Sequence, residues 1–323
     1  MQQLGKNFYM ANIPLPNSPL KNLNCYIFCD TKYNLVIDTG FNMPECKQAL
    51  SDAATELGID WHKTILFITH LHSDHCGLAS FIQKLGAKVL TGRVDGMRLS
   101  QMYDPEYWGF FEEMMRHYDL AKYGFTKNDH PGFRYRPAEY IDCEYLEIGS
   151  KINTGEYEFT VFDLAGHTPG QVGLWEAKHK YLFCGDHILA TISPNIVEWT
   201  DVHDSLGIYL NNLRKVCDLA PSMVYPSHRA LISDYQERVN ELLAHHDERL
   251  KEVMSILDTQ PHSVSDVAAR MTWDIRAKSW EDFPKGQKWF ASGEAAAHLE
   301  HLRAQGKVIR HLEGEIYFYS KKQ

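Results

Sequence analysis

The stretch that decides the fold is Thr69-His70-Leu71-His72-Ser73-Asp74-His75-Cys76-Gly77, which begins where the run KTILFIT, residues 63–69, ends. The run predicts a buried strand, and the residues that follow Ser73 predict a helix. Side chains alternate along a strand, so His70 and His72 point to the same side. Asp74 and His75 then fall in the first helical turn. Four potential ligands within six residues are hard to explain by packing, and they indicate a metal-binding motif.

Three more residues of ligand type stand at the ends of later predicted strands. His167 follows YEFTVFDLAG, Asp186 follows KYLFCG, and His228 follows SMVYPS. A rigid sheet can bring such strand-end side chains to one point. The complete set of imidazoles and carboxylates suits zinc, and equally iron or manganese, because these ligand types do not decide the metal.

Up to about Pro226, short apolar runs alternate with helical segments, which predicts α/β layering. The helical segments are expected at residues 44–57, 74–85 and 204–219. Strands are expected in the runs NCYIF, NLVID, KTILFIT, AKVLT, YEFTVFDL, KYLFC and SMVYP.

Residues 101–140 have a different character, with 11 of the 39 aromatic residues of the chain (7 Trp, 17 Tyr and 15 Phe). We interpret this segment as a partly helical insertion. Its rings can form a local core or a homodimer contact, since aromatic residues dominate both. The alternative is a lid over the active site.

The region from Ser233 predicts helix, helix, helix and hairpin, which is the order of a winged-helix domain. Ser233 and Gln236 have capping-box spacing before a long amphipathic helix, and Ser263 and Asp266 have the same spacing before a second. A third helix is expected at about 292–305, followed by two strands that turn near Glu313 and Gly314. The segment from Trp273 to Phe290 interrupts this pattern.

The length of 323 residues predicts a catalytic domain at 1–232 and a smaller domain at 233–323. The composition, 44% hydrophobic and 23% charged, is that of a water-soluble protein with no membrane span. The N-terminus lacks the features of a secretory signal, so we expect a cytoplasmic protein. Seven cysteines without a CxxC pair argue against a disulfide framework. The net charge of −9 lacks the basic excess of many nucleic-acid-binding proteins.

The chain resembles the metallo-β-lactamase superfamily, whose motifs are matched in order by THLHSDHCG, AGHTPG, CGDH and PSH. The resemblance covers about the first 230 residues. It implies a four-layer αββα sandwich, an α/β (α+β) fold, with two divalent metal ions at one edge of the two sheets. Zinc is the metal we expect, with iron or manganese as alternatives.

The resemblance also implies roles for individual residues. It places His70, His72 and His167 on the first metal, Asp74, His75 and His228 on the second, and Asp186 as a bridge between them. Asp38 in LVIDTG matches an aspartate beside the site, which would orient a ligand. The alternative is that Asp38 caps the turn before Gly40. We expect Cys76 and Cys184 not to be ligands, although each stands next to ligand motifs.

A metal-bound water loses its proton readily, because coordination lowers its pKa from about 16 towards roughly 7. The resemblance therefore implies a hydrolase in which metal-bound hydroxide attacks the substrate. Asp74 could carry a proton as well as bind metal.

Departures from known branches narrow the substrate. Asp186 stands where common zinc β-lactamases have Cys, which disfavours antibiotic hydrolysis. Leu189 stands where acyl-homoserine lactonases have Tyr. We expect a small acyl substrate, a thioester or ester. A β-lactamase-like group with a similar winged-helix domain includes an endoribonuclease, so RNA cleavage is the alternative, and a non-catalytic regulatory protein is a further one.

The predicted third helix does not have the basic face that usually reads nucleic acid. Nucleic-acid binding is therefore possible but not favoured, and we expect this domain to pack on the catalytic core or on another subunit. The helix carries Glu294, His298, Glu300, His301 and Arg303.

Overall fold

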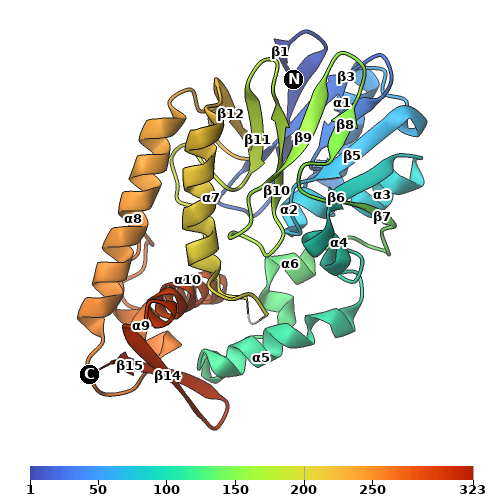
Figure 1. The fold of residues 1–323 in the computed structure, drawn as a ribbon. Helices are drawn as coiled ribbons and strands as arrows, with labels where there is room; N and C mark the ends of the chain where they lie inside the picture. Colours follow the sequence, from blue (N-terminus) through green and yellow to red (C-terminus); the bar gives the residue numbers. More distant parts are fainter. Residues whose placement is uncertain (200, 323) are drawn as a thin grey trace.

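Two β-sheets stacked face to face, with helices on their outer sides, form the larger part of the chain (Figure 1). The computed structural model describes residues 1–199 and 201–322. Within them, one sheet has the order β1-β2-β3-β4-β5-β6-β7 and the other the order β12-β11-β10-β9-β8. The strands of the first sheet are β1 (Gln2–Gly5), β2 (Phe8–Pro14), β3 (Asn22–Cys29), β4 (Asn34–Ile37), β5 (Thr64–Ile68), β6 (Lys88–Gly92) and β7 (Cys143–Leu146). Those of the second are β8 (Lys151–Asn153), β9 (Glu158–Asp163), β10 (Val172–Glu176), β11 (Tyr181–Gly185) and β12 (Met223–Pro226).

Strand direction brings the loops of interest to one edge. In the first sheet, β4, β5, β6 and β7 run parallel to one another. In the second, β9 and β11 are both antiparallel to β10, and β12 is parallel to β11, so all three point the same way. The carboxyl ends of β4 and β5 therefore lie together, and so do those of β9, β11 and β12.

The three apolar layers of the sandwich are separate clusters of buried side chains. Aromatic rings fill the space between the sheets, where Phe8 stacks on Phe28 at 4.3 Å and Phe183 on Tyr225 at 4.8 Å between centroids. The run β5 is buried along its whole length, as its unbroken apolar sequence predicts. The expected αββα order is confirmed.

Helices cover both outer faces. The first sheet carries α1 (Pro44–Glu56) and α3 (Ala79–Lys84), and the second carries α7 (Ser205–Leu219) and α8 (Tyr235–Ile256). Helices α1 and α7 match the helices predicted at 44–57 and 204–219 closely. In the described ranges 1–199 and 201–322, no helix is both long and apolar enough to cross a membrane.

The single helix expected at residues 74–85 is wrong, because the chain forms α2 (Ser73–Cys76) and α3 instead. The backbone N–H and the hydroxyl of Thr39 both donate to the carbonyl oxygen of His75, each at 2.8 Å. The N–H of Leu78 in turn donates to the Thr39 hydroxyl at 3.2 Å. The His75 carbonyl and the Leu78 N–H therefore bond to Thr39 and not to other residues of the helix, and the helix is interrupted between α2 and α3.

The aromatic insertion is partly helical, as expected, and it is buried against the chain's own C-terminal region. Phe111 and Tyr118 pack on Trp289 with centroids 4.8 and 6.2 Å apart, within one shared apolar cluster. This supports the local-core interpretation of these rings. Its elements, with the helix that precedes it, are α4 (Arg93–Leu99), α5 (Gly109–His117), α6 (Pro131–Arg134) and short 3-10 turns at 105–108, 121–123 and 127–129.

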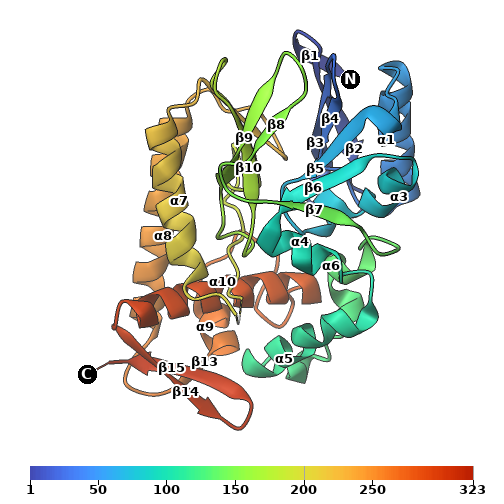
Figure 2. The ribbon, with the colours of Figure 1, turned by 45° about the vertical axis from the view of Figure 1, so that its right-hand side comes forward.

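The C-terminal elements follow the predicted order, and α10 lies below the sandwich on the side of α4 and α6 (Figure 2). They are α8, β13 (His262–Ser263), α9 (Val264–Arg270), α10 (Lys285–Ala304), β14 (Val308–Glu313) and β15 (Ile316–Lys321), with a sheet of order β13-β15-β14. The winged-helix class and the domain division at 232/233 stay predictions, and Gln323 lies outside the described residues.

Two details of this region were predicted wrongly and one correctly. The cap of α8 is Asp234, which accepts from the N–H of Glu237 at 3.1 Å, and not Ser233. Helix α10 begins at Lys285, seven residues before the expected residue 292 and directly after Pro284, whose ring disfavours a helical conformation in the residue before it. The capping box of Ser263 and Asp266 is confirmed.

A buried histidine pair joins α8 to α10. The ring of His298 donates through Nδ1 to the carbonyl of Glu294 at 2.7 Å, so its Nε2 accepts from His246 Nδ1 at 3.2 Å. The remaining nitrogen of His246 is buried without a partner. Burial lowers the pKa of His246 to about 2 and that of His298 to about 3, so both rings are neutral in the folded protein.

This pair predicts a loss of stability in mild acid. In the unfolded chain each imidazole takes up a proton below pH about 6.5, whereas the folded rings do not, so stability present above that pH falls as the pH drops. Between pH 7.5 and 5.5 each ring should lower the free energy of unfolding by about 1.4 kcal/mol. Urea unfolding of metal-free protein should show that His246→Gln loses about 1.4 kcal/mol less than the parent over this range.

The matched control is His311→Gln on the exposed side of β14, which should lose as much as the parent. An identical pH dependence for the parent and His246→Gln would contradict this explanation.

Candidate metal centre

The loops after β4, β5, β9, β11 and β12 meet at one edge of the sandwich. Backbone hydrogen bonds join the two sheets at this edge: the Val172 N–H of β10 donates to Thr69 O at 2.9 Å, and the Asn24 N–H of β3 donates to Ser227 O at 2.7 Å. These loops carry all the ligand-type residues that the sequence singles out. The structure therefore brings strand ends from both halves of the sandwich to a single place.

The seven predicted ligands form three overlapping groups, in each of which one ligand atom per residue lies within 4.8 Å of the others. Asp186 and two histidines make the middle group, which links the other two. The groups are His70, His72 and His167; His70, His75 and Asp186; and Asp74, His75 and His228.

In the first group three imidazole nitrogens point at one another. His72 Nδ1 lies 3.2 Å from His70 Nε2 and 3.0 Å from His167 Nε2. Two of the outer nitrogens have partners outside the cluster: His167 Nδ1 donates to the carbonyl of Asn195 at 2.8 Å, and His70 Nδ1 lies 3.0 Å from the Thr69 hydroxyl. The inward nitrogens are thus left with lone pairs that face a common point.

The group of Asp74, His75 and His228 has the same design. His228 Nδ1 donates to the carbonyl of Asn22 at 2.8 Å, and its Nε2 lies 3.4 Å from Asp74 and 3.5 Å from Asp186. His75 Nδ1 contacts Asp38 at 2.8 Å, and its Nε2 lies 3.6 Å from Asp186. The inward nitrogens of both histidines and one oxygen of Asp186 are buried without a hydrogen-bond partner.

These unpartnered atoms fit metal ions. Leaving a buried polar atom unsatisfied costs about 1–3 kcal/mol, so a cluster of inward-facing lone pairs is unfavourable unless a cation lies among them. Imidazole nitrogens with carboxylate oxygens are ligands of zinc, iron and manganese. The donor set and its burial therefore suit a pair of divalent cations.

The electrostatics of the metal-free cluster agree with this. Burial, followed by the neighbouring His167, lowers the pKa of His72 to about 3, which keeps that ring neutral. Burial raises the pKa of Asp74, but His75 and His228 outweigh it and lower the value to about 2. Neutral imidazoles and charged carboxylates are the protonation states that metal binding requires.

His75 and His228 differ from His72. Burial lowers their pKa values, but nearby carboxylates outweigh it and raise both. Asp38 is the first of these for His75, and Asp186 is the first for His228. Metal binding at these two rings would displace protons.

Asp38 organises the edge rather than capping a turn. Its backbone has a left-handed φ of 62°, and its side chain is fully buried. The carboxylate accepts from the Thr69 N–H at 2.9 Å, the Thr69 hydroxyl at 2.8 Å and the Ser227 hydroxyl at 3.1 Å, and it contacts His75 Nδ1 at 2.8 Å. The alternative of a cap for the turn before Gly40 is not what the structure shows.

A second supporting carboxylate, Asp95 at the start of α4, was missed from the sequence. It accepts from the Leu71 N–H at 3.1 Å, from the Thr168 hydroxyl at 2.6 Å and from the Gly170 N–H at 2.7 Å. It thus joins the loop of His70 and His72 to the loop of His167. Burial raises its pKa to about 6. Its only signal in the sequence is its place shortly after the strand AKVLT.

The two cysteines beside the motifs point away from the cluster. Cys76 donates through its thiol to the carbonyl of Leu71 at 3.3 Å, and Cys184 to that of Ile188 at 3.4 Å. Burial raises the pKa of Cys184 to about 12, so it stays protonated. Neither residue belongs to a ligand group among the described residues.

Comparison with known proteins agrees with this geometry. A family model described as the metallo-beta-lactamase superfamily matches residues 20–228. The chain belongs to the metallo-β-lactamase superfamily. Its similarity to the solved structure of the metallo-beta-lactamase family protein TTHA1429 from Thermus thermophilus extends over 98% of this chain and 99% of that one, with 26% identity and a TM-score of 0.83.

Curated relatives are more distant but cover most of the chain. The probable metallo-hydrolase YqjP of Bacillus subtilis is 24% identical over 89% of this chain and 90% of its own length. The acyl-coenzyme A thioesterase MBLAC2 of Gallus gallus is 21% identical over 77% of this chain and 87% of its own length. These relatives support a hydrolase of the metallo-β-lactamase superfamily.

The cluster makes a direct prediction about metal content. His167→Ala and Asp186→Ala each remove a donor, so elemental analysis of the purified variants should show clearly less metal than the parent, with an unchanged circular dichroism spectrum. Cys184→Ala is the control, and it should keep the parent metal content because its thiol points away. Parent metal content in both ligand variants would contradict the assignment.

Asp38 gives a second prediction. Asp38→Asn replaces an acceptor of four donors by an amide whose NH₂ must face one of them, so His75 should lose its fixed orientation. Loss of such a supporting carboxylate typically weakens metal binding about 10 to 100-fold, which competition with a chelating dye would measure. An unchanged metal affinity would show that His75 is held by other contacts.

Proposed function

We propose that the chain is a metal-dependent hydrolase that cleaves a small acyl thioester or ester at a binuclear centre. The observation that carries the proposal is the convergence of seven nitrogen and oxygen donors, among which the inward atoms of His75, His228 and Asp186 are buried without a hydrogen-bond partner. Zinc is the metal we favour, with iron and manganese as alternatives.

Each side chain has a role in this proposal. The first ion would be held by His70, His72 and His167, the second by Asp74, His75 and His228, and Asp186 would bridge them. When bound, the ions would lower the pKa of a water molecule and polarise the attacked oxygen.

Asp74 is the side chain we assign to proton transfer. Its side chain is 12% exposed, compared with 8% for Asp186 and 0% for His75 and His228. Its lowered pKa keeps it charged near neutral pH. A charged carboxylate at the open side of the cluster can accept a proton from water and release it to a leaving group.

An acyl substrate is supported by the surroundings of His167 and by one relative. Asn195, which accepts from His167, also donates to the carbonyl of Phe290, and the ring of His130 lies 5.6 Å from that of Trp289. Helix α10 thus lies next to the Asn195 segment and carries Trp289, which packs on the insertion, so we propose that this aromatic region covers the acyl chain. MBLAC2, which is named an acyl-coenzyme A thioesterase, is a relative over most of the chain.

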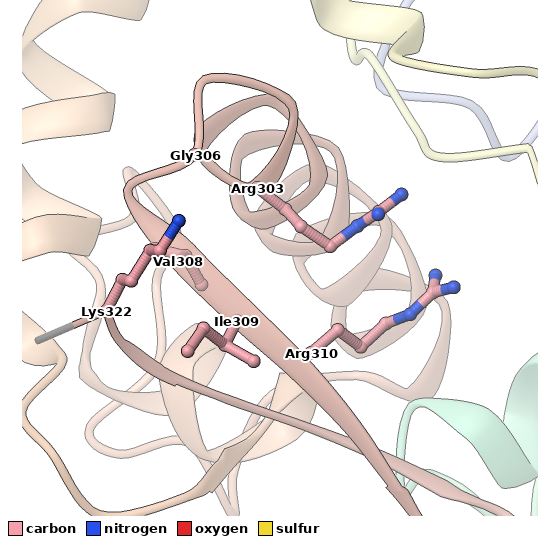
Figure 3. Close-up of a pocket in the computed structure, with 6 residues that line it drawn as sticks. All are labelled: Arg303, Gly306, Val308, Ile309, Arg310 and Lys322. Carbon is pink, nitrogen blue, oxygen red and sulfur yellow. The ribbon is translucent and has the colours of Figure 1, made fainter.

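RNA cleavage is the second candidate, and one observation speaks for it. A pocket of about 320 Å³ is lined in part by three basic side chains, Arg303, Arg310 and Lys322, which are drawn in Figure 3. However, Arg303 and Arg310 both bind the buried carboxylate of Glu300, at 2.6 and 3.1 Å, which offsets part of their charge. His298 and Glu300 on α10 are buried, so the helix offers them to its own chain and not to a ligand. A non-catalytic regulatory protein would have no need of the complete donor set.

Turnover assays separate these functions. Metal-loaded protein should hydrolyse members of a panel of acyl-coenzyme A thioesters and simple esters of increasing chain length. Chelator treatment should abolish turnover, and adding back zinc or manganese should restore it. Asp186→Ala, prepared in parallel, controls for contaminating hydrolases. Cleavage of single-stranded RNA without acyl hydrolysis would reverse the ranking, and inactivity towards both with two metals bound would favour the regulatory alternative.

A further inference from the structure

His167 is oriented from outside the cluster by a single backbone group. Its Nδ1 donates to the carbonyl of Asn195 at 2.8 Å. Because a carbonyl oxygen only accepts, this bond fixes the tautomer and leaves the Nε2 lone pair facing His72 and Asp186. The position of Asn195 therefore decides where the His167 lone pair points.

Asn195 lies in a connection that has no helix or strand between β11 and α7 in its described residues, 186–199 and 201–204. Its side-chain amide donates to Glu294 Oε2 at 3.2 Å and to the carbonyl of Phe290 at 3.3 Å. Both acceptors belong to α10, more than ninety residues later in the chain. The partner of His167 is thus anchored by the C-terminal region.

Glu294 is itself held in place. Arg249 on α8 donates to its other carboxylate oxygen at 3.3 Å. The same guanidinium donates to Glu252 at 2.6 Å and to the carbonyl of Thr272 at 2.8 Å, and it lies 4.2 Å from the centre of the Trp273 ring. Arg249 is buried, so this network is shielded from water and stays specific in its geometry.

Close packing supports the same contact independently. A Cβ atom added to Gly293 would lie 2.7 Å from Val197 Cγ1 and 3.1 Å from Val197 Cβ. Only glycine lets α10 approach this part of the connection so closely. The helix therefore touches the Asn195 segment by shape as well as by hydrogen bonds.

We infer that Asn195 and Glu294 are positioning residues of the metal centre, through which helix α10 orients His167. The inference rests on the proposed function, because it takes His167 as a ligand of the first metal. It gives the C-terminal region a role at the metal centre, because α10 holds in place the segment whose backbone carbonyl orients His167.

The test is the stepwise binding of zinc to the full-length protein in competition with a chelating dye. Glu294→Ala should weaken the site that His167→Ala removes, by about 10 to 100-fold, and leave the other site unchanged. Asn195→Ala should do the same, and it keeps α10 intact should Glu294→Ala fold poorly. Glu294→Gln can offer its one oxygen to Asn195 or to Arg249 but not to both, so it should weaken the first site less than Glu294→Ala does.

A reversed pair tests the hydrogen bond itself. Asn195→Asp places two carboxylates face to face and should weaken the first site. Adding Glu294→Gln supplies an amide donor towards the new carboxylate, so the double variant should regain affinity. A merely structural role of either residue would not produce this reciprocal rescue.

The matched control is Glu300→Ala on the same helix. Glu300 is also buried and paired with arginines, and it accepts from Tyr319 at 2.7 Å, yet it makes no hydrogen bond to Asn195. It should lower stability without changing either zinc affinity. In addition, Glu294→Ala should have no further effect on the remaining site in a His167→Ala background.

Two outcomes must be kept apart. A parent protein that binds none of zinc, iron and manganese would defeat the proposed function. A parent that binds two zinc ions, with Glu294→Ala and Asn195→Ala binding them equally well, would overturn this inference alone. Equal weakening of both sites by Glu294→Ala and Glu300→Ala would also overturn it, because that result indicates general loosening.

Discussion

The buried carboxylate of Asp38 is the interaction on which the rest of the site depends. It receives hydrogen bonds from residues after β5 in the first sheet and after β12 in the second, and it contacts His75. A buried carboxylate without hydrogen-bond partners is strongly unfavourable. Moving these donors apart would leave Asp38 in that state, so they stay together. The two sheets are therefore locked together at the edge where the donors converge.

That lock lets the chain keep an arrangement that is unfavourable by itself. The inward nitrogens of His75 and His228 have no protein partner, and the three nitrogens of the first group face one another. The outer nitrogens of His70, His75, His167 and His228, in contrast, each have a partner outside the cluster. The fold thus holds the rings from behind and leaves their lone pairs free, which is what preorganised metal binding requires.

Much of this could be predicted from the sequence because it is encoded locally. The HxHxDH spacing at the end of KTILFIT and the ligand-type residues after three later strands led to all seven clustered residues. The αββα order also followed from the resemblance. What failed depends on contacts between distant segments. The hydroxyl of Thr39 bonds to the His75 carbonyl and so interrupts the helix expected at 74–85. Asp95 binds loops that are distant from it in the sequence, and no local pattern predicts those contacts.

Contacts within the chain also explain the composition of α10, which differs from that of a helix that reads nucleic acid. In solvent, Glu294, His298 and Glu300 would make a poor recognition surface for nucleic acid. In the structure they face inward, where Glu294 meets Asn195 and Arg249, His298 meets His246, and Glu300 meets Tyr319. Polar residues on a helix that packs against its own catalytic sandwich are bonded groups and not a surface for a partner. The unusual composition of α10 is therefore better explained by its contacts within the chain, with the Asn195 connection and with α8 and β15, than by any missing ligand.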